Sequence, residues 1–249
     1  MSEIKKRHNP FTLLSSLPEV IETRDVRIAA GWERKTAVES MFRWVRAGYI
    51  APFATGVYFN LVASPKAPQT HVFEAAQRTI RRPMLLIGAS ALRDAGWTTQ
   101  MPSGYELGIA TDRNIRTWKN MAGIAAEGRS LKWFAKVSTH KIKGEGTFDR
   151  LPPGLALVDA IVSAERFAVL PKEVKKQHLE NGTVTWHPHP DDICVPVDKE
   201  PEAVWEEIVE AAEVLGVPFE TIRAYAAGIP DLEDVVTPAP PARRPAPGH

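Results

Sequence analysis

Residues 20–60 carry the pattern that most constrains the fold of this chain. They read in order as a short helix, a tight turn, a second helix and a two-stranded ribbon. The first helix is expected over residues 24–30, with Thr23 as its N-cap, since a threonine hydroxyl can accept a hydrogen bond from a free N–H of the first turn. Gly31 should end this helix, because glycine readily adopts the left-handed conformation of a helix C-terminus. The succession predicts a helix-turn-helix motif.

The second helix of the motif is expected to begin near Arg34 and to stop at Gly48. Apolar residues recur in it at spacings of three and four, which predicts one buried stripe. The predicted stripe consists of Val38, Met41, Phe42 and Val45. The opposite face would then carry polar side chains that can reach phosphates and base edges. These side chains are Arg34, Lys35, Thr36, Glu39, Ser40 and Arg43.

Two short segments rich in strand-forming residues follow, at 49–51 and 57–59. Residues 52–56 between them are expected to form a turn, the wing of a winged helix-turn-helix. The usual ligand of that motif is double-stranded DNA. A helical hairpin with a ribbon that only packs remains the alternative.

Charge predicts a local DNA-binding surface and excludes a general polyanion-binding one. Residues 1–60 hold nine lysines and arginines against six acids, whereas the whole chain has a net charge of +1. Non-specific affinity comes mainly from phosphate contacts, so a single copy should bind weakly and with strong salt dependence. Tighter binding is therefore expected from two copies bound to an inverted repeat, as a dimer on DNA.

Composition indicates an ordinary cytoplasmic protein of one or two domains. The chain has 249 residues, of which 44% are hydrophobic, enough for a sizeable core. Its one cysteine, Cys194, allows no internal disulfide, so a reducing cytosol is expected. The charged N-terminus shows no signal peptide. No window approaches the roughly 20 apolar residues that span a bilayer, so no membrane association is expected.

The expected fold class is α+β, in two domains. A winged helix-turn-helix domain covers residues 1–63, and a linker with two prolines covers 64–70. Residues 71–235 form the second, mixed α+β domain, with strands such as 105–112 and 131–138 in its first half and helices in its second half. Residues 236–249 are rich in proline and are expected to form a disordered tail.

Chemistry-bearing residues cluster weakly outside the first domain. The segment 186–198 holds histidines, aspartates and Cys194, which are metal-ligand types, but their spacing matches no closed site and favours a rigid loop. A nuclease would need an acidic arrangement that Asp191, Asp198 and Lys199 only approximate. No metal, cofactor or catalytic residue is therefore predicted.

Three smaller features of the second domain need an interpretation. Asp159 lies within an apolar helix, where it could be buried and functional, because a buried carboxylate needs a partner. The simpler interpretation places it at the edge of the apolar stripe, facing water or capping a neighbouring element. The basic clusters 81–82 and 141–143 either extend a nucleic-acid surface or, more commonly, are solvated charge. Trp97, Trp118 and Trp133 are expected in the core rather than in a stacking platform.

The chain resembles AbiEi-type antitoxins, the antitoxin half of type IV (abortive infection AbiE) toxin–antitoxin pairs. The resemblance rests on the layout of residues 25–59, on IGASALRDAGWTTQMPSGYELGIATD at 87–112, and on LALVDAIV at 155–162. It covers about residues 11–165. The remaining C-terminal part fits by length and position only, and its stretch rich in tryptophan, histidine and proline has no counterpart, so the resemblance leaves the role of residues 170–249 open.

The resemblance implies a function for each domain. The winged helix would bind inverted repeats in its own promoter and repress the operon. The second domain would counteract a nucleotidyltransferase-like toxin encoded nearby, without requiring a stable complex and without catalytic activity of its own. The DNA-contacting residues implied by position are Arg34, Lys35, Thr36, Ser40, Arg43 and Thr55.

Other functions remain open at this point. One is a winged-helix transcriptional regulator whose second domain senses a small ligand. Another is a nuclease-like enzyme carried by the winged helix. In a further alternative, the second domain only mediates protein–protein contact.

Overall fold

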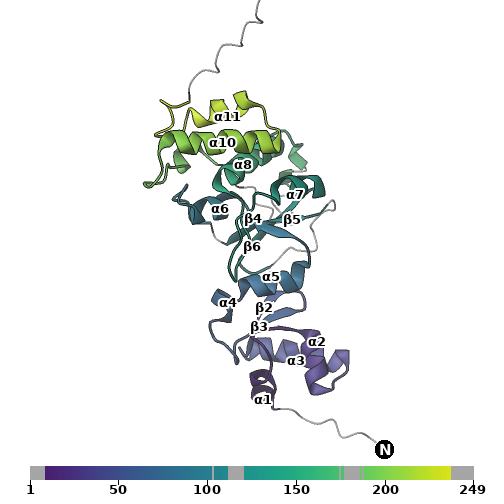
Figure 1. Ribbon diagram of the computed structural model, residues 1–249. Coiled ribbons are helices and arrows are strands. Elements are labelled where there is room, and N and C mark those ends of the chain that lie inside the picture. The colour runs from purple at the N-terminus through teal and green to yellow at the C-terminus, as the bar shows by residue number, and fades with distance from the viewer. Residues whose placement is uncertain are drawn as a thin grey trace, which may run out of the picture.

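The structure is a computed structural model that describes residues 9–102, 104–111, 121–173, 175–176, 186 and 188–236. The molecule is elongated, with its first helices at one end and the last two, α10 and α11, at the other (Figure 1). None of the helices in these ranges is long and apolar enough to cross a membrane. Two sets of elements are distinguished below, an N-terminal unit of residues 9–63 and a second unit of residues 64–236.

The N-terminal unit alternates helices and strands around one small sheet. Its elements are α1 (Pro10–Ser15), β1 (Val20–Glu22), α2 (Thr23–Ala30), α3 (Arg34–Arg46), β2 (Ile50–Ala54) and β3 (Val57–Asn60). The strands pair antiparallel in the order β1-β3-β2. The ribbon predicted from the sequence is confirmed as β2 and β3. The third strand, β1, was not predicted, because three residues are too few to show a period.

Helix α2 begins one residue earlier than expected. Glu22 is its N-cap, and Glu22 and Asp25 form a reciprocal capping box in which Asp25 Oδ2 accepts the Glu22 N–H at 2.9 Å. Thr23 is therefore the first helical residue, and the prediction of Thr23 as cap is wrong, because the acidic pair already satisfies the free N–H groups. Gly31 ends α2 with φ +64°, as predicted.

Helix α3 is rotated relative to the predicted stripe. The residues buried in it are Ala37, Ser40, Met41 and Trp44. Phe42, predicted to be buried, is 63% exposed. Trp44 is the largest side chain on the helix, and it packs beside Trp32 with ring centroids 6.0 Å apart. Burying this tryptophan gains the most apolar contact and sets the rotation of the helix.

Both faces of the first sheet are covered. Ile21 and Ile50 pack with α1, α2 and α3 in one core cluster. On the other face, Phe53, Val57 and Phe59 join a larger cluster that continues through the second unit. The two units therefore share a core, and the first sheet is sandwiched between α3 and α5, as Figure 1 shows.

The predicted linker, residues 64–70, is partly helical and partly buried. It contains α4 (Ala67–Thr70), and Ala67 is fully buried against the shared core. A second tie joins the units, since the Ala122 N–H donates to the Phe53 carbonyl at 2.9 Å. Residues 64–70 thus do not separate the two units, despite their two prolines.

The second unit is a mixed α+β arrangement, which confirms the expected fold class. It begins with α5 (Val72–Ile80), β4 (Met84–Leu86), α6 (Gly88–Asp94), β5 (Tyr105–Ala110), β6 (Ile124–Arg129) and α7 (Leu131–Val137). It continues with α8 (Pro153–Ala168), the 3₁₀ turn η2 (Pro190–Asp192), α10 (Pro201–Leu215) and α11 (Phe219–Ala226). Strand β5 lies between β4, antiparallel to it, and β6, parallel to it.

One predicted strand of the second unit is a helix. Residues 131–137 form α7, because Ser130 caps it by accepting the Trp133 N–H at 3.1 Å. Of the predicted tail, Val236 is buried at the edge of the core, and residues 237–249 lie outside the described residues.

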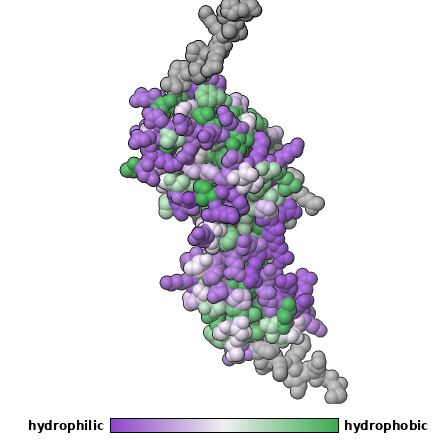
Figure 2. Space-filling view, in the orientation of Figure 1, coloured by the Kyte–Doolittle hydropathy of each residue, from purple (hydrophilic) through white to green (hydrophobic). Residues whose placement is uncertain are grey.

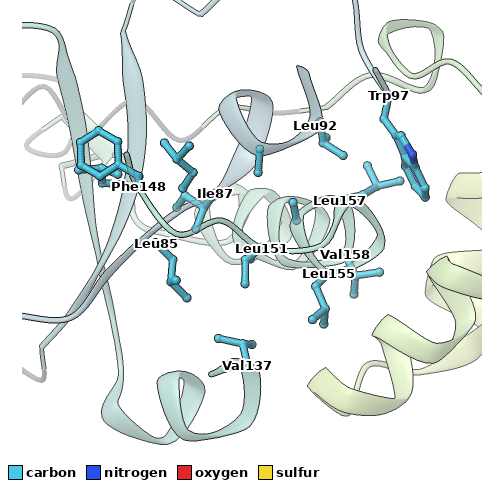
Figure 3. Close-up of a cluster of buried hydrophobic side chains, with 14 of the residues drawn as sticks. Leu85, Ile87, Leu92, Trp97, Val137, Phe148, Leu151, Leu155, Leu157 and Val158 are labelled. Atoms are coloured by element: carbon cyan, nitrogen blue, oxygen red, sulfur yellow. The ribbon is translucent and has the colours of Figure 1, made fainter. Parts of the chain in front are cut away.

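The core of the second unit surrounds α8 (Figure 3). Leu155, Leu157 and Val158 of this helix are buried, and β4, α6 and α7 supply Leu85, Leu92 and Val137 around them. Trp97 is fully buried, as predicted, whereas Trp133 is only partly buried and Trp118 lies outside the described residues. Helix α8 therefore joins the second sheet to the helices at the far end of the molecule.

Candidate nucleic-acid interface

The exposed face of α3 is dominated by charge. Its centre is a stripe of exposed side chains at spacings of four, three and four residues, which places them on one side of the helix. This outward stripe consists of Lys35, Glu39, Phe42 and Arg46. Arg34 and Arg43 are also exposed and flank the stripe. The helix thus carries four cationic side chains and one acidic side chain.

The elements around α3 hold this face outward. The tight turn after α2 is closed by the Trp32 N–H, which donates to the Arg27 carbonyl at 3.0 Å. Met41 and Trp44 anchor the inner side of α3 in the core cluster with Leu14 and Ile50. The opposite side is therefore left toward solvent, and Figure 2 shows hydrophobic and hydrophilic residues mixed on the visible surface of this unit.

The predicted contact residues do not all lie on the exposed face. Arg34, Lys35 and Arg43 are exposed, and Thr36 is half-buried. Ser40 is 1% exposed, so its predicted place on the outer face is wrong. It belongs to the stripe that Trp44 draws inward, and its hydroxyl accepts a hydrogen bond from Arg43 Nη2 at 3.0 Å. Ser40 can thus orient Arg43 but cannot itself reach a base edge.

Two residues of the outward stripe were missed by the sequence reasoning. Phe42 was assigned to the core and Arg46 was not assigned. The signal that could have identified them is the alternative buried stripe of Ala37, Ser40, Met41 and Trp44, which also has spacings of three and four. This stripe contains Trp44, the largest single side chain of the helix, and choosing it turns Phe42 and Arg46 outward.

The predicted wing is reduced to a two-residue turn. Strand β2 runs to Ala54 and β3 starts at Val57, with Gly56 at φ +82° between them. A register shift between Pro52 and Ala54 marks a bulge in β2. The Gly56 carbonyl accepts the Thr23 N–H at 3.2 Å, so the tip is tied to the start of α2. Thr55 is exposed at this tip.

Helix α5 holds the start of α2 through ion pairs. Arg78 contacts Asp25 at 3.1 Å, and Arg81 contacts both carboxylate oxygens of Glu22 at 3.0 Å. Those two acids are the capping box of α2. Because the Arg81 side chain is 63% exposed, its pair adds little stability, but it fixes where the helix begins relative to the second unit.

The two basic clusters noted in the sequence meet at one cavity. Arg81, Arg82 and Lys141 line a cavity of about 580 Å³ between α5 and α7. Lys141 pairs there with Asp149. Burial disfavours the charged carboxylate of Asp149, but hydrogen bonds from Lys141 and the Gly144 N–H outweigh it and lower its pKa. Much of the positive charge at this cavity is thus compensated within the chain.

A buried ionic cluster lies inside the second unit. Arg129 donates from Nη2 to Asp159 at 2.7 Å and to Ser163 at 2.9 Å, and its Nη1 lies 2.6 Å from Glu127. Trp133 Nε1 donates to the other oxygen of Asp159 at 2.7 Å. Asp159 is 5% exposed, so the interpretation that it faces water is wrong.

Electrostatics keep this cluster charged. Burial disfavours the charged form of Arg129, but Asp159 and then Glu127 outweigh that cost and raise the pKa of the guanidinium above its ordinary value. The cluster ties β6, α7 and α8 together. Its groups bond one another, which is the behaviour of a structural element rather than of a reactive one.

Glu106 stands between this cluster and a larger cavity. It lines a cavity of about 460 Å³ together with Met101, Met121 and Trp186. Its carboxylate accepts the Ser90 N–H at 3.4 Å. Burial raises the pKa of Glu106 above its ordinary value, with hydrogen bonds from the Ser90 and Ala89 backbone opposing. Gly88 leaves room for it, because a Cβ there would lie 2.4 Å from Glu106 Oε2.

The segment 186–198 shows no assembled metal site in its described part. His189 pairs with Asp191 at 3.3 Å, and Lys199 pairs with Glu207 rather than with Asp198. No three histidine, cysteine or acidic side chains come together to hold a metal ion among the residues described. Burial raises the pKa of the Cys194 thiol, which disfavours a reactive thiolate.

Comparisons of the sequence with models of known protein families and with curated proteins found no match. The functional argument therefore rests on the residues and contacts described above.

Proposed function

We propose that this protein is a cytoplasmic, DNA-binding antitoxin that represses its own type IV toxin–antitoxin operon. The observation that carries the DNA-binding part is the exposed face of α3. Lys35, Phe42 and Arg46 project from it, with Arg34 and Arg43 on its flanks. A single helix of this width fits the major groove of B-form DNA, and its cations match the phosphates on either side.

The order of elements supports a winged helix-turn-helix. A helix, a strand, two further helices and a hairpin follow one another, and β3 lies between β1 and β2 in the sheet. In this proposal α3 enters the major groove, and Thr55 at the hairpin tip contacts the backbone. With only four cations on α3, tight binding needs two copies on an inverted repeat.

The antitoxin part is supported by the resemblance to AbiEi-type proteins. The second unit would counteract a nucleotidyltransferase-like toxin encoded nearby, without a stable complex. Its shared core with the N-terminal unit has a practical consequence, because cutting the chain after residue 66 would expose Phe53, Val57 and Phe59. Both functions are therefore tested on the full-length chain with point variants.

The first test removes two cations of the proposed interface. Full-length Lys35→Ala/Arg43→Ala should bind its own upstream DNA more weakly in fluorescence anisotropy. If both side chains contact phosphates, the slope of log affinity against log salt should fall by about 2. The paired control is Arg166→Ala/Lys172→Ala, which removes two exposed cations at the end of α8 and beyond it. Equal affinity of the double variant and the wild type would rule out α3 as the DNA-contacting helix.

The second test concerns the toxin. The neighbouring gene and this one are expressed in bacteria from separate inducible promoters, so that repression cannot influence the result. The neighbour alone should stop growth, and both the wild type and Lys35→Ala/Arg43→Ala should restore it. A harmless neighbour would remove the antitoxin proposal and leave the DNA-binding one intact.

A ligand-sensing regulator is the second candidate, and the 460 Å³ cavity favours it. A half-buried carboxylate with two methionines and a tryptophan suits a small cationic ligand with an apolar body. Amine metabolites should then raise the melting temperature and change operator affinity in the wild type and not in Glu106→Gln. No shift with any amine would set this candidate aside.

A further inference from the structure

We propose that Phe42 reads the methyl group of a thymine in the major groove and so sets the sequence preference of α3. This inference rests on the proposed DNA binding and adds its specificity. The phenyl ring stands at the middle of the outward stripe, where many DNA-binding helices place a side chain that hydrogen-bonds to a base edge. Its ligand is the C5-methyl group that distinguishes thymine from the other bases at the groove edge.

The fold does not use Phe42 for packing. Its residue surface is 63% exposed, whereas Trp44, two residues later, is 5% exposed. The two core clusters that the described residues form do not include it. A phenylalanine exposed at the centre of a helix gains little for stability, and its place on the outward stripe leaves the ring available to contact a ligand outside the chain.

The neighbours of Phe42 indicate the kind of surface that it meets. Lys35 and Arg46 stand at the two ends of the stripe, and Arg34 and Arg43 flank it. An apolar protein partner would call for further apolar side chains around the ring. Here the exposed side chains next to the ring are Glu39, Arg43 and Arg46, and the nearest apolar ones, Val38 and Val45, are half-buried. The matching surface is therefore mainly anionic with an apolar point within it. Thymine-containing DNA has that character, with phosphates on both sides of the groove and the methyl on its floor.

Glu39 indicates which part of the outward stripe faces the bases. It lies one turn before Phe42 on the same stripe and is exposed. A carboxylate beside phosphates would be repelled, whereas over base edges it can accept a hydrogen bond from a cytosine amino group. The centre of the stripe therefore faces bases, and the cations at its ends and flanks face the backbone.

A second copy of the chain is a poorer occupant. A twofold contact through this stripe would bring together only one exposed apolar side chain from each copy, which is too little apolar area for a stable dimer.

The test uses a DNA duplex selected from a randomised library by the full-length wild type. Each thymine of that duplex is replaced in turn by deoxyuridine, which removes only the methyl group. Binding of wild type and Phe42→Ala to every duplex is measured by fluorescence anisotropy. Ile28→Ala is the control, since Ile28 is an apolar side chain of α2 that is 68% exposed.

At one or two thymines, deoxyuridine should weaken wild-type binding by about three- to tenfold. Phe42→Ala should bind the unmodified duplex with a similar loss and should be insensitive to the same replacements, while Ile28→Ala keeps the wild-type pattern. If Phe42→Ala stays sensitive at every thymine, or if its loss appears equally on unrelated DNA, the inference is overturned. Failure of the wild type to enrich any sequence would overturn the DNA-binding proposal itself, a distinguishable result.

Discussion

Removing the carboxylate of the buried Asp159 should severely destabilise the protein. In Asp159→Ala, Arg129 loses its bonds from Nε and Nη2 to the carboxylate and keeps the one from Nη2 to Ser163, while the Trp133 indole N–H loses its acceptor. The side chain of Arg129 is only 8% exposed, so little water can reach it to replace these bonds. The guanidinium stays charged, because no accessible pH deprotonates an arginine.

The expected loss of unfolding free energy in Asp159→Ala depends on the groups that remain around Arg129. Breaking a buried ion pair costs about 3–5 kcal/mol, since it leaves an uncompensated charge. Glu127 stays at 2.6 Å and compensates part of that charge, which favours the lower end of this range. The unpaired indole N–H adds about 1 kcal/mol. We expect a total near 4 kcal/mol and a fall in melting temperature of roughly 8–16 °C for a chain of this length.

The assay is urea unfolding of full-length protein followed by tryptophan fluorescence, with a thermal melt by circular dichroism. Asp149→Ala is the matched control. Its carboxylate also pairs with a cation, but in a partly exposed site, where such pairs contribute at most about 1 kcal/mol. The double variant Asp159→Leu/Arg129→Met removes both charges and should recover most of the loss.

Two results would refute this reasoning. A loss below about 1 kcal/mol in Asp159→Ala would mean that the cluster is hydrated and not a dry ion pair. A double variant no more stable than Asp159→Ala would mean that the carboxylate acts through packing and not through the charge of Arg129.

Two further variants test the described contacts. Glu106→Gln should stabilise the protein at pH 7: the folded state holds this proton more tightly than the unfolded chain does, so the ionised group costs stability above its raised pKa. This gain in unfolding free energy should shrink as the pH falls and vanish below about pH 4.5. A gain that stays constant in urea unfolding from pH 4 to 8 would contradict the prediction. Asn60→Ala should cost about 2–3 kcal/mol, because the buried amide donates to the Leu14 and Pro18 carbonyls at 2.8 and 3.0 Å. An unchanged urea midpoint would show that water replaces these bonds.

Much of the local structure of the N-terminal unit could be predicted from residues close in sequence. Gly31 ended α2 where a left-handed residue was expected, and α3, β2 and β3 formed at the predicted places. Such features depend on contacts within a few residues, which a single sequence contains. The α+β class of the whole chain was also predictable from the mixture of patterns.

Long-range packing decided the rest. Two stripes on α3 satisfy helical spacing, and only the surface beneath the helix, into which Trp44 fits, determines which one is buried. Asp159 looks the same in sequence whether or not Arg129, thirty residues earlier, reaches it. Residues 64–70 have the composition of a linker, yet Ala67 is buried because both units share a core.

The sequence by itself determined where α2, α3 and the β2–β3 hairpin form and which side chains α3 carries. Tertiary structure decided which of those side chains meet the solvent, and so placed Phe42 outward and Ser40 inward. The physical reason is that helical periodicity specifies the spacing of a face but not its direction. Direction is set by the apolar area that each rotation buries against partners distant in the chain.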